Sequence, residues 1–541
     1  MKDHKEHKEH RDDGIYKWLA LFVVVIGTFM AILDSSIVNI AMPKMMAVFG
    51  VSLEDAKWII TAYALALGAI IPLTGFLGDI FGTKRLYMYA LAMFTVGSLL
   101  CGFAWNNMSM IIFRIIQALG GGMIMPIGMS IIYQIFPQEE RGTALGVWGI
   151  AAMAAPTIGP TLGGYIIEYL DWRLIFNVNV PVGVVGVIFA WILLKETPRK
   201  PFKGFDIIGF LSATVGLVSI LYVLGEGTTI DWGDIKNPIL IAVGVASLIL
   251  FVANELTHPD PLLDLRVFSI AEFSLSQVIT CSMTLALMGG MYILPVFFQN
   301  MRGFSAIQTG LMLLPSAVVT GIMMPISGKL FDKFGAKPVV IPGLIILAIS
   351  SFELAKVINL DTSKQTFIWI TVIRSIGIGL AMMPVSTLGM NAVPMRQVGR
   401  ASAISNTIRQ VMGAVSVTIV STVMTNNQNL NYARLSEQVN SYNQPTNDLV
   451  KGLQGVYMQG GLAQSAAQGA ALSTISGLVQ RQAYIDAMGA AAGLMAFAVI
   501  VSIVLAFFLK EKKKNIKADS TAAKSGDQSV EEDSHMAIAF E

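Results

Sequence analysis

The stretches GFLGDIFGTKR (residues 75–85) and GKLFDKFGAKP (residues 328–338) are two versions of one pattern. They share Gly, Leu, Asp, Phe, Gly and Lys at matching positions, and each follows the second apolar segment of a set of six. The fourth segment of each set also opens with an arginine, Arg114 in the first set and Arg374 in the second. Two such matches in the same order predict an internal repeat of two six-helix halves.

Apolar segments dominate the rest of the chain, since 54% of its 541 residues are hydrophobic and only 13% are charged. Soluble domains average about 25% charged residues, and about 20 apolar residues are enough to cross a bilayer. Fourteen such segments are present: 17–42, 56–78, 86–105, 109–134, 143–168, 173–194, 206–225, 238–256, 272–298, 306–328, 338–356, 366–390, 402–424 and 483–509. The predicted fold is therefore an all-α polytopic membrane protein.

The predicted organisation consists of two six-helix bundles and an inserted pair of linker helices. Its parts are a tail at 1–16, the N-terminal bundle at 17–195, the inserted pair at 206–256, the C-terminal bundle at 272–509 and a tail at 510–541. Sorting the 37 Lys and Arg residues by loop places most of them on the side of the two tails, which predicts that both tails are cytoplasmic. The polar segment from about 425 to 482 is then outside, as an ordered cap over the exit or as a floppy loop.

Several classes of function have no support in the sequence. A net charge of +2 does not suggest a nucleic-acid partner, and no phosphate loop of the form GxxxxGK[ST] predicts ATP binding. The two cysteines, Cys101 and Cys281, lie in apolar segments and imply neither a disulfide nor a metal site. No nucleophile–base pair stands out, so we expect neither an enzyme nor a cofactor.

Asp34 interrupts the first apolar segment. A charged side chain at the centre of a membrane helix costs about 2.5–3.5 kcal/mol on insertion scales, so an intramembrane acid is a functional candidate. On a helical wheel Asp34 shares a stripe with Gly27, Ala31, Val38 and Ala41, and small residues let a neighbouring helix approach closely. We therefore expect Asp34 to face protein or a water-filled cavity and to carry a proton. The alternative is a structural role, as a helix cap or a satisfied buried acid.

Arg114 lies on a similar stripe with Ala118, Gly121 and Met125, so it too is predicted to face inward. A buried arginine stays charged and needs a partner. Such an arginine either takes part in transport or forms an ion pair that merely holds helices together.

The chain resembles the fourteen-helix drug:proton antiporters of the major facilitator superfamily, the branch of the QacA and EmrB type exporters. The resemblance covers about residues 17–510 and is carried by LDSSIVNIAMP (33–43), GFLGDIFGTKR (75–85), RIIQALGGG (114–122), PTIGPTLGG (156–164), WRLIFNVNVPVG (172–183) and GRASAISNTIRQVMGA (399–414). It implies that the chain exports hydrophobic drugs or toxic amphiphiles in exchange for protons. The family's fourth-helix motif assigns proton coupling to its arginine, so Arg114 is expected to act with Asp34.

Three further motifs have expected roles. The first resembles the family's gate, which latches the halves in the outward-open state; its residues are Gly75, Gly78, Asp79, Gly82, Lys84 and Arg85. Its glycines predict a tight turn, its aspartate a contact with a helix N-terminus or a basic group, and its basic pair an anchor at the cytoplasmic face. The repeat supplies a second gate of Gly328, Asp332, Gly335 and Lys337.

The third motif lies in the fifth helix and resembles the family's antiporter signature, which favours antiport over symport. Its residues are Pro156, Gly159, Pro160, Gly163 and Gly164. Prolines and glycines together predict a weakened, bent helix whose backbone packs closely against a neighbour.

Polar and flexible side chains on other inward stripes are candidates for a substrate cavity. They are Asn39, Gln117, Met123, Met125, Arg374, Asn406, Arg409 and Gln410. Methionines suit varied apolar ligands, although they also serve as filler in membrane helices. Related exporters of organic cations often add acids in the second half, and none occurs in the tenth span or beside Arg409. The arginines therefore suit neutral or anionic amphiphiles, unless they are paired internally.

The predicted function is proton-coupled export by alternating access across the cytoplasmic (inner) membrane. The expected partners are a hydrophobic small molecule, protons and the lipid bilayer, with a periplasmic adaptor protein where a second membrane exists. The closest alternative is a dedicated exporter of a metabolite, lipid or fatty acid on the same scaffold. A proton symporter and a non-transporting membrane receptor are weaker alternatives.

Overall fold

The structure is a computed structural model that describes residues 2–197, 199, 201, 204–225, 230, 233–440 and 442–509, without the side chains of 2–13, 157, 160 and 306. Its α-helices are α1 (Lys2–Phe49), α2 (Leu53–Ile70), α3 (Leu73–Phe81), α4 (Thr83–Gly102), α5 (Asn107–Ile135), α6 (Arg141–Tyr169), α7 (Leu174–Asn177), α8 (Asn179–Leu193), α9 (Ile207–Gly225), α10 (Lys236–Thr257), α11 (Ala271–Val296), α12 (Ala306–Phe334), α13 (Lys337–Val357), α14 (Lys364–Asn391), α15 (Val398–Gln438), α16 (Gln444–Gln459) and α17 (Gln464–Phe507). Within the described residues, thirteen helical segments are long and apolar enough to cross a membrane, and the bent pair α2–α3, taken as one span, makes fourteen. The chain is thus a multi-pass membrane protein, as predicted; its predicted tail at 510–541 lies outside the described residues.

The first two predicted helices differ in detail from the structure. α1 begins at Lys2, so most of the predicted tail continues the first helix. The second predicted helix is split into α2 and α3, which are bent by 56°. The bend falls at Pro72, because proline has no N–H to donate and its ring clashes with the carbonyl four residues earlier. Thr74 satisfies the carbonyl of Ile71 through its hydroxyl at 2.6 Å and its N–H at 3.1 Å.

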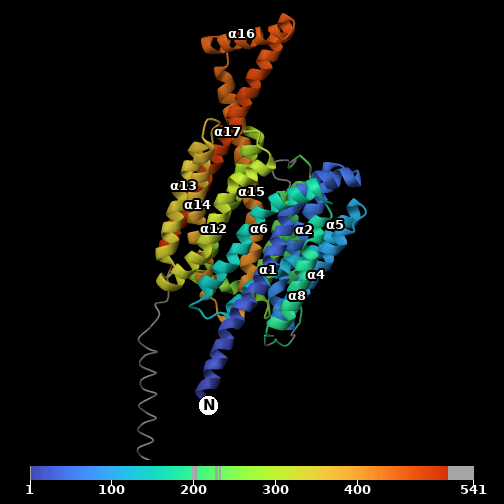
Figure 1. Cartoon of the computed structure of the whole chain (residues 1–541), viewed down its shortest axis with the longest axis vertical. Helices are drawn as coiled ribbons and strands as arrows, with labels where there is room; N and C mark the ends of the chain where they lie inside the picture. The colour runs from blue at the N-terminus through green and yellow to red at the C-terminus, as the bar shows by residue number, and fades with distance from the viewer. Residues whose placement is uncertain are drawn as a thin grey trace, which may run out of the picture.

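The two halves lie side by side, and α6 and α12 form their most extensive contact (Figure 1). A Cβ at Gly146 would lie 2.5 Å from the carbonyl oxygen of Met324, and one at Gly328 would lie 2.0 Å from that of Gly142. The helix backbones therefore touch at points where only glycine fits. A second contact between the halves is made by α15, which packs against α3 and α5.

The internal repeat is visible in the packing of the third and fourth helices of each half. A Cβ at Gly120 of α5 would lie 2.4 Å from the backbone nitrogen of Phe94 in α4. A Cβ at Gly377 of α14 would lie 2.6 Å from the backbone nitrogen of Leu347 in α13. The same close approach in both halves supports the predicted duplication.

The inserted pair, α9 and α10, packs against both halves. α9 contacts α2 of the first half and α15 of the second, and α10 packs on α9. Trp58 of α2 stacks on Tyr222 of α9 with ring centroids 5.8 Å apart, and the Thr418 hydroxyl of α15 donates to the carbonyl of Leu224 at 2.9 Å.

The segment at 425–482 is helical. α15 and α17 extend beyond the bundle as a pair, and α16 crosses their tips (Figure 1). The Tyr457 hydroxyl of α16 bonds that of Thr474 in α17 at 2.7 Å. The expectation of a floppy loop is therefore wrong for the described residues, and the ordered helices project away from the bundle instead of covering it. We call this segment the stalk, its side of the bundle the stalk end, and the opposite side, where Gly82 and Gly335 lie, the motif end.

Candidate functional site

Asp34 lies on α1 and is completely shielded from solvent. Ala31, Val38 and Ala41 are at most 7% exposed, and Gly27 is buried as well. The predicted inward stripe of α1 is thus confirmed.

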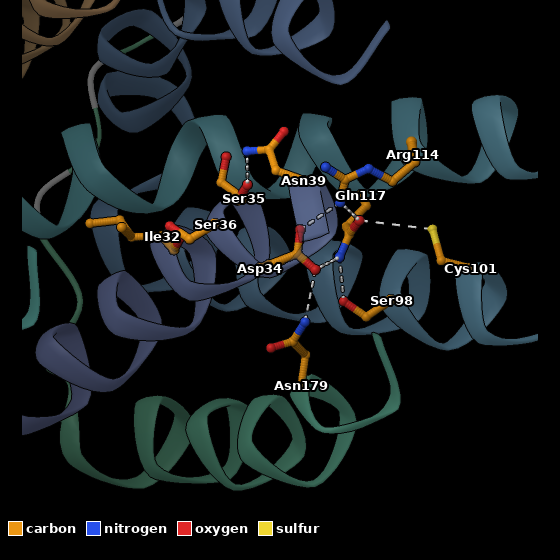
Figure 2. Close-up of polar contacts among 10 residues, drawn as sticks. All are labelled: Ile32, Asp34, Ser35, Ser36, Asn39, Ser98, Cys101, Arg114, Gln117 and Asn179. Atoms are coloured by element: carbon orange, nitrogen blue, oxygen red, sulfur yellow. Dashed lines mark hydrogen bonds and ion pairs between the residues drawn. The ribbon is translucent and has the colours of Figure 1, made fainter. Parts of the chain in front are cut away.

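Three side chains donate hydrogen bonds to the Asp34 carboxylate (Figure 2). Nη1 of Arg114 lies 2.5 Å from Oδ2, while Nε2 of Gln117 and Nδ2 of Asn179 lie 2.8 and 2.9 Å from Oδ1. Arg114 and Gln117 are one turn apart on α5, and Asn179 begins α8. The carboxylate therefore ties α1 to two other helices of its half.

A second layer of contacts surrounds this pair. The Gln117 side chain accepts from Arg114 at 2.6 Å and donates to the Ser98 hydroxyl of α4 at 2.7 Å. The Arg114 guanidinium lies 3.8 Å from the centre of the Tyr63 ring of α2. Arg114 is only 1% exposed, and its predicted inward orientation is confirmed.

Burial makes the charges of this pair interdependent. Removing one partner from a buried ion pair leaves an uncompensated charge and costs about 3–5 kcal/mol. A proton added to Asp34 would likewise leave Arg114 with only an amide oxygen and aromatic rings. Protonation of Asp34 would therefore weaken the contacts that join these helices.

At the motif end, Asp332 of the second half caps a helix of the first half. Its carboxylate accepts from the backbone N–H of Gly142 at 3.0 Å, and from the N–H and hydroxyl of Thr143 at 2.9 and 2.7 Å. The first N–H groups of a helix have no partner within it and attract negative charge. The acid of the second gate motif thus latches α12 to α6.

Asp79, the matching acid of the first half, contacts a helix of the second half. Its Oδ2 lies 3.4 Å from Nε of Arg400, near the start of α15. A Cβ at Gly75 would lie 2.9 Å from Cα of Arg400, and the Ser402 hydroxyl donates to the carbonyl of Pro126 at 2.9 Å. The two halves are therefore held together at the motif end by both copies of the repeated motif.

The glycines of the first gate motif do not act together as predicted. Gly75 and Gly78 lie within α3 and form no turn, and Gly75 instead allows α15 to approach. Gly82 alone makes the turn into α4, with a φ of 85°, and Gly335 makes the matching turn, also at 85°. Glycine adopts this conformation without the clash that a Cβ would cause.

The basic residues of the motifs hold helix ends within their own halves. Lys84 donates to the carbonyl of Trp191 in α8 at 2.6 Å, and Lys337 donates to that of the last residue of α17 at 2.8 Å. Nε of Arg85 lies 3.4 Å from the Glu196 carboxylate. These contacts stay within each half and do not join the two halves.

The loop that follows the inserted pair contacts both halves at the motif end. Asp260, in the loop after α10, accepts from Nη2 of Arg400 at 2.7 Å, and Asp264 accepts from Gln397 at 3.0 Å. Leu262 of the same loop packs with Phe76 of α3. Arg400 therefore lies between Asp79 of the first half and Asp260 of the loop that follows α10.

Replacing Asp260 by asparagine is expected to loosen this part of the gate. A partly exposed ion pair contributes up to about 1 kcal/mol, or about fivefold in the equilibrium between closed and open gates. Hydrogen–deuterium exchange of 398–405 should then be faster in Asp260→Asn than in the wild type. Asp234→Asn is the matched control, because Asp234 lies at the other end of α10, where its carboxylate is 3.9 Å from Nζ of Lys236. Equal exchange in both variants would contradict the role of Asp260.

The antiporter motif brings α6 against α1. A Cβ at Gly159 would lie 2.7 Å from Cβ of Ser36, and one at Gly163 would lie 3.2 Å from Cγ2 of Ile37. The predicted close approach is confirmed at these two glycines, whereas Gly164 has no atom within 4 Å of its Cβ position. The side chain of Pro160 lies outside the described residues.

The predicted cavity residues do not form one group. Gln117 belongs to the Asp34 network, and Asn39 is exposed and donates to the carbonyl of Ser35 in its own helix at 3.3 Å. Asn406 is buried, with Nδ2 3.9 Å from the sulfur of Met129 across the interface of the halves. Gln410 is half-buried.

Methionines gather where the halves meet. Met123 and Met125 of α5 belong to one apolar cluster with Met324 of α12 and Met383 of α14. A Cβ at Gly149 of α6 would lie 2.5 Å from the sulfur of Met324 and 3.0 Å from Cε of Met383. They form an apolar contact between the halves, and their predicted role in binding substrate stays a prediction.

Arg374 and Arg409 differ from Arg114 in having no acidic partner among the described residues. Arg374 is 6% exposed, and the carbonyl of Ala286 in α11 is its one recorded acceptor. Nε of each of the two arginines is buried without a hydrogen bond.

The sequence reasoning did not single out three residues that make these contacts: Asn179, Asp260 and Arg400. Asn179 and Arg400 lie in stretches that carry the family resemblance, but only their neighbours in space reveal their roles. One signal was available for Arg400, since it stands beside a glycine at the start of its helix as Arg141 does in α6.

Comparison with known proteins agrees with the fold and the motifs. Residues 24–417 match the Major Facilitator Superfamily. The uncharacterized MFS-type transporter YhcA of Bacillus subtilis is 41% identical over 421 residues, which cover 78% of this chain and 79% of YhcA. The multidrug export protein EmrB of Escherichia coli is 28% identical over 446 residues, 82% of this chain and 86% of EmrB.

A solved structure shows the same fold. The proton:xylose symporter XylE matches with a TM-score of 0.59 at 14% identity, over 92% of this chain and 97% of that one. This chain is therefore a transporter of the Major Facilitator Superfamily, and its multidrug-exporter relatives associate it with the fourteen-helix drug:proton antiporters.

Proposed function

We propose that the protein exports apolar amphiphiles in exchange for protons, with Asp34 as the proton carrier. The observation that carries this proposal is the single acid in the middle of the first-half helices, fully buried and held by three donors that include Arg114. An intramembrane ion pair of this kind is expected at a proton relay. EmrB, a multidrug export protein, supports export as the direction and drugs as the cargo.

The cycle follows from the contacts. With Asp34 charged, Arg114, Gln117 and Asn179 hold α1, α5 and α8 together. A proton that reaches Asp34 from outside discharges the acid and releases this grip, and closure on the outer side follows. Opening at the motif end then lets the proton leave to the inside while a substrate binds from that side.

We propose that the motif end faces the cytoplasm, as the distribution of Lys and Arg indicates. The contacts of Asp332 and Asp79 then close the inner side, and the stalk stands outside the cytoplasmic membrane. One proton that moves inward across 100 mV supplies about 2.3 kcal/mol, which supports about a fiftyfold gradient of a neutral substrate.

The test is proton flux in liposomes that contain the purified protein and a lumenal pH dye. A panel of neutral, cationic and anionic hydrophobic compounds is added in turn. We expect at least one compound to elicit proton movement that a protonophore abolishes and that protein-free vesicles lack. Substrate export at the same rate with and without a proton gradient would overturn the proposal.

A further inference from the structure

Two arginines within the membrane-spanning helices of the second half have no acidic partner among the described residues. In the first half, Asp34 and Arg114 neutralise each other. In the second half, Arg374 and Arg409 lie within α14 and α15, and the sequence has no Asp or Glu between Asp361 and Glu437. The acids of α11, α12 and α13 lie near the ends of their helices, and Asp486 of α17, at the start of the last apolar segment, is exposed and accepts from Gln482 at 2.8 Å.

Arg374 repeats the position of Arg114 but lacks its acid. Arg114 lies in the first half of α5 and reaches a carboxylate on α1. Arg374 lies in the first half of α14 and reaches α11, where it donates to the carbonyl of Ala286. A Cβ at Gly290 would lie 2.5 and 2.6 Å from Nη1 and Nη2 of this guanidinium, so α11 leaves room for the cation but offers no charge.

Arg409 is the second such cation, on α15. The structure records no hydrogen bond from its guanidinium to a described residue, and it lies within electrostatic range of Tyr133 on α5. Asn406 lies one turn away on the same helix and contacts Met129 of α5. Arg409 is therefore at the interface of the halves, the surface that separates during transport.

Uncompensated intramembrane arginines need an anion. A buried charge without a partner costs several kcal/mol, and arginine keeps its charge in proteins. Its planar guanidinium matches the geometry of a carboxylate or phosphate. The methionine cluster of α5, α12 and α14 supplies an apolar surface beside these helices.

We infer that the exported amphiphile is an anion, whose carboxylate or similar group pairs with Arg374 while its apolar body contacts the methionine cluster. This inference rests on the proposed function and names its substrate class. It has an energetic consequence, since a proton moving in and an anion moving out transfer two charges per cycle. A potential of 100 mV then supports about a fiftyfold substrate gradient for each charge that moves. Two charges move when the substrate is an anion, whereas only the proton's charge moves when the substrate is neutral.

The test uses 11-(dansylamino)undecanoic acid and its methyl ester, which differ in charge but share the apolar body. Binding is measured by dansyl fluorescence at pH 8 to protein in nanodiscs, with empty nanodiscs subtracted. We expect the wild type to bind the acid about tenfold more tightly than the ester, the equivalent of one modest charge pair. Arg374→Gln should reduce this ratio to less than about twofold without weakening ester binding.

Two variants make the result specific. Arg374→Lys keeps the positive charge and should retain most of the preference. Arg434→Gln removes an exposed arginine of the stalk and should leave the ratio unchanged. Equal binding of acid and ester by the wild type, or a preference that survives in Arg374→Gln, would overturn the inference.

A second measurement depends on no variant. In wild-type proteoliposomes with an imposed potassium diffusion potential, export of the acid should depend on voltage more steeply than export of the ester. Equal dependence would overturn the inference even if proton flux is found, whereas an acid preference without any proton flux would overturn the proposed function alone.

Discussion

Asp34→Asn is expected to reduce substrate-dependent proton flux to the level of protein-free liposomes. Asparagine has nearly the same shape and can still accept a hydrogen bond from Arg114, but it cannot bind and release a proton. The carboxylate is the single acid in the middle of the first-half helices, so no neighbour within the network can replace it. The lumenal pH dye with the substrate found for the wild type provides the measurement.

The control addresses the structural alternative. Breaking the ion pair leaves Arg114 as a buried cation and destabilises the fold by about 3–5 kcal/mol, which would lower flux without any role in coupling. The double variant Asp34→Asn/Arg114→Gln restores a neutral network. If the pair is only structural, flux should return in the double variant together with thermal stability. If Asp34 carries the proton, stability should recover and flux should stay absent.

Gly328→Val is expected to stop transport by preventing closure at the motif end. A Cβ at this position would lie 2.0 Å from the carbonyl oxygen of Gly142, and a backbone atom cannot move aside as a side chain does. Overpacking of this kind costs about 1–3 kcal/mol, which shifts the gate by about five- to 150-fold toward the open state. The N–H groups of Gly142 and Thr143 would lose their bonds to Asp332, so their hydrogen exchange should accelerate.

Gly321→Val is the matched control on the same helix, because its nearest neighbour is a side-chain carbon of Ile150 at 4.0 Å. This variant should transport normally and keep slow exchange at Gly142. Normal transport by Gly328→Val would show that the close contact of α6 and α12 is not needed for the cycle.

Helical periodicity explains which parts of the site were predictable. A helix turns by a constant angle per residue, so the stripe of small residues around Asp34 was sufficient to predict its burial. The same holds for Arg114, and the repeated gate motif predicted two related halves. The motif also predicted that its aspartate contacts a helix N-terminus or a basic group. Asp332 makes the first kind of contact and Asp79 makes the second.

Local chemistry was less informative where several glycines lie close together. Gly75, Gly78 and Gly82 share one motif, but only Gly82 has the positive φ that a turn requires. Gly75 instead contacts α15, more than 300 residues later in the chain. The motif alone cannot distinguish a glycine needed for its own backbone from one needed by a neighbouring helix.

The sequence by itself determined the membrane-spanning helices, the repeat, the inward faces and the residues that carry charge within the membrane. Only the tertiary structure decided which charges meet. Asp34 pairs with Arg114 across 80 residues and with Asn179 across 145, and Asp260 reaches Arg400 across 140. The physical reason is that periodicity settles the direction of a side chain from its own helix, whereas its partner depends on how distant helices pack. For the same reason only the structure showed that Arg114 is neutralised and that Arg374 is not.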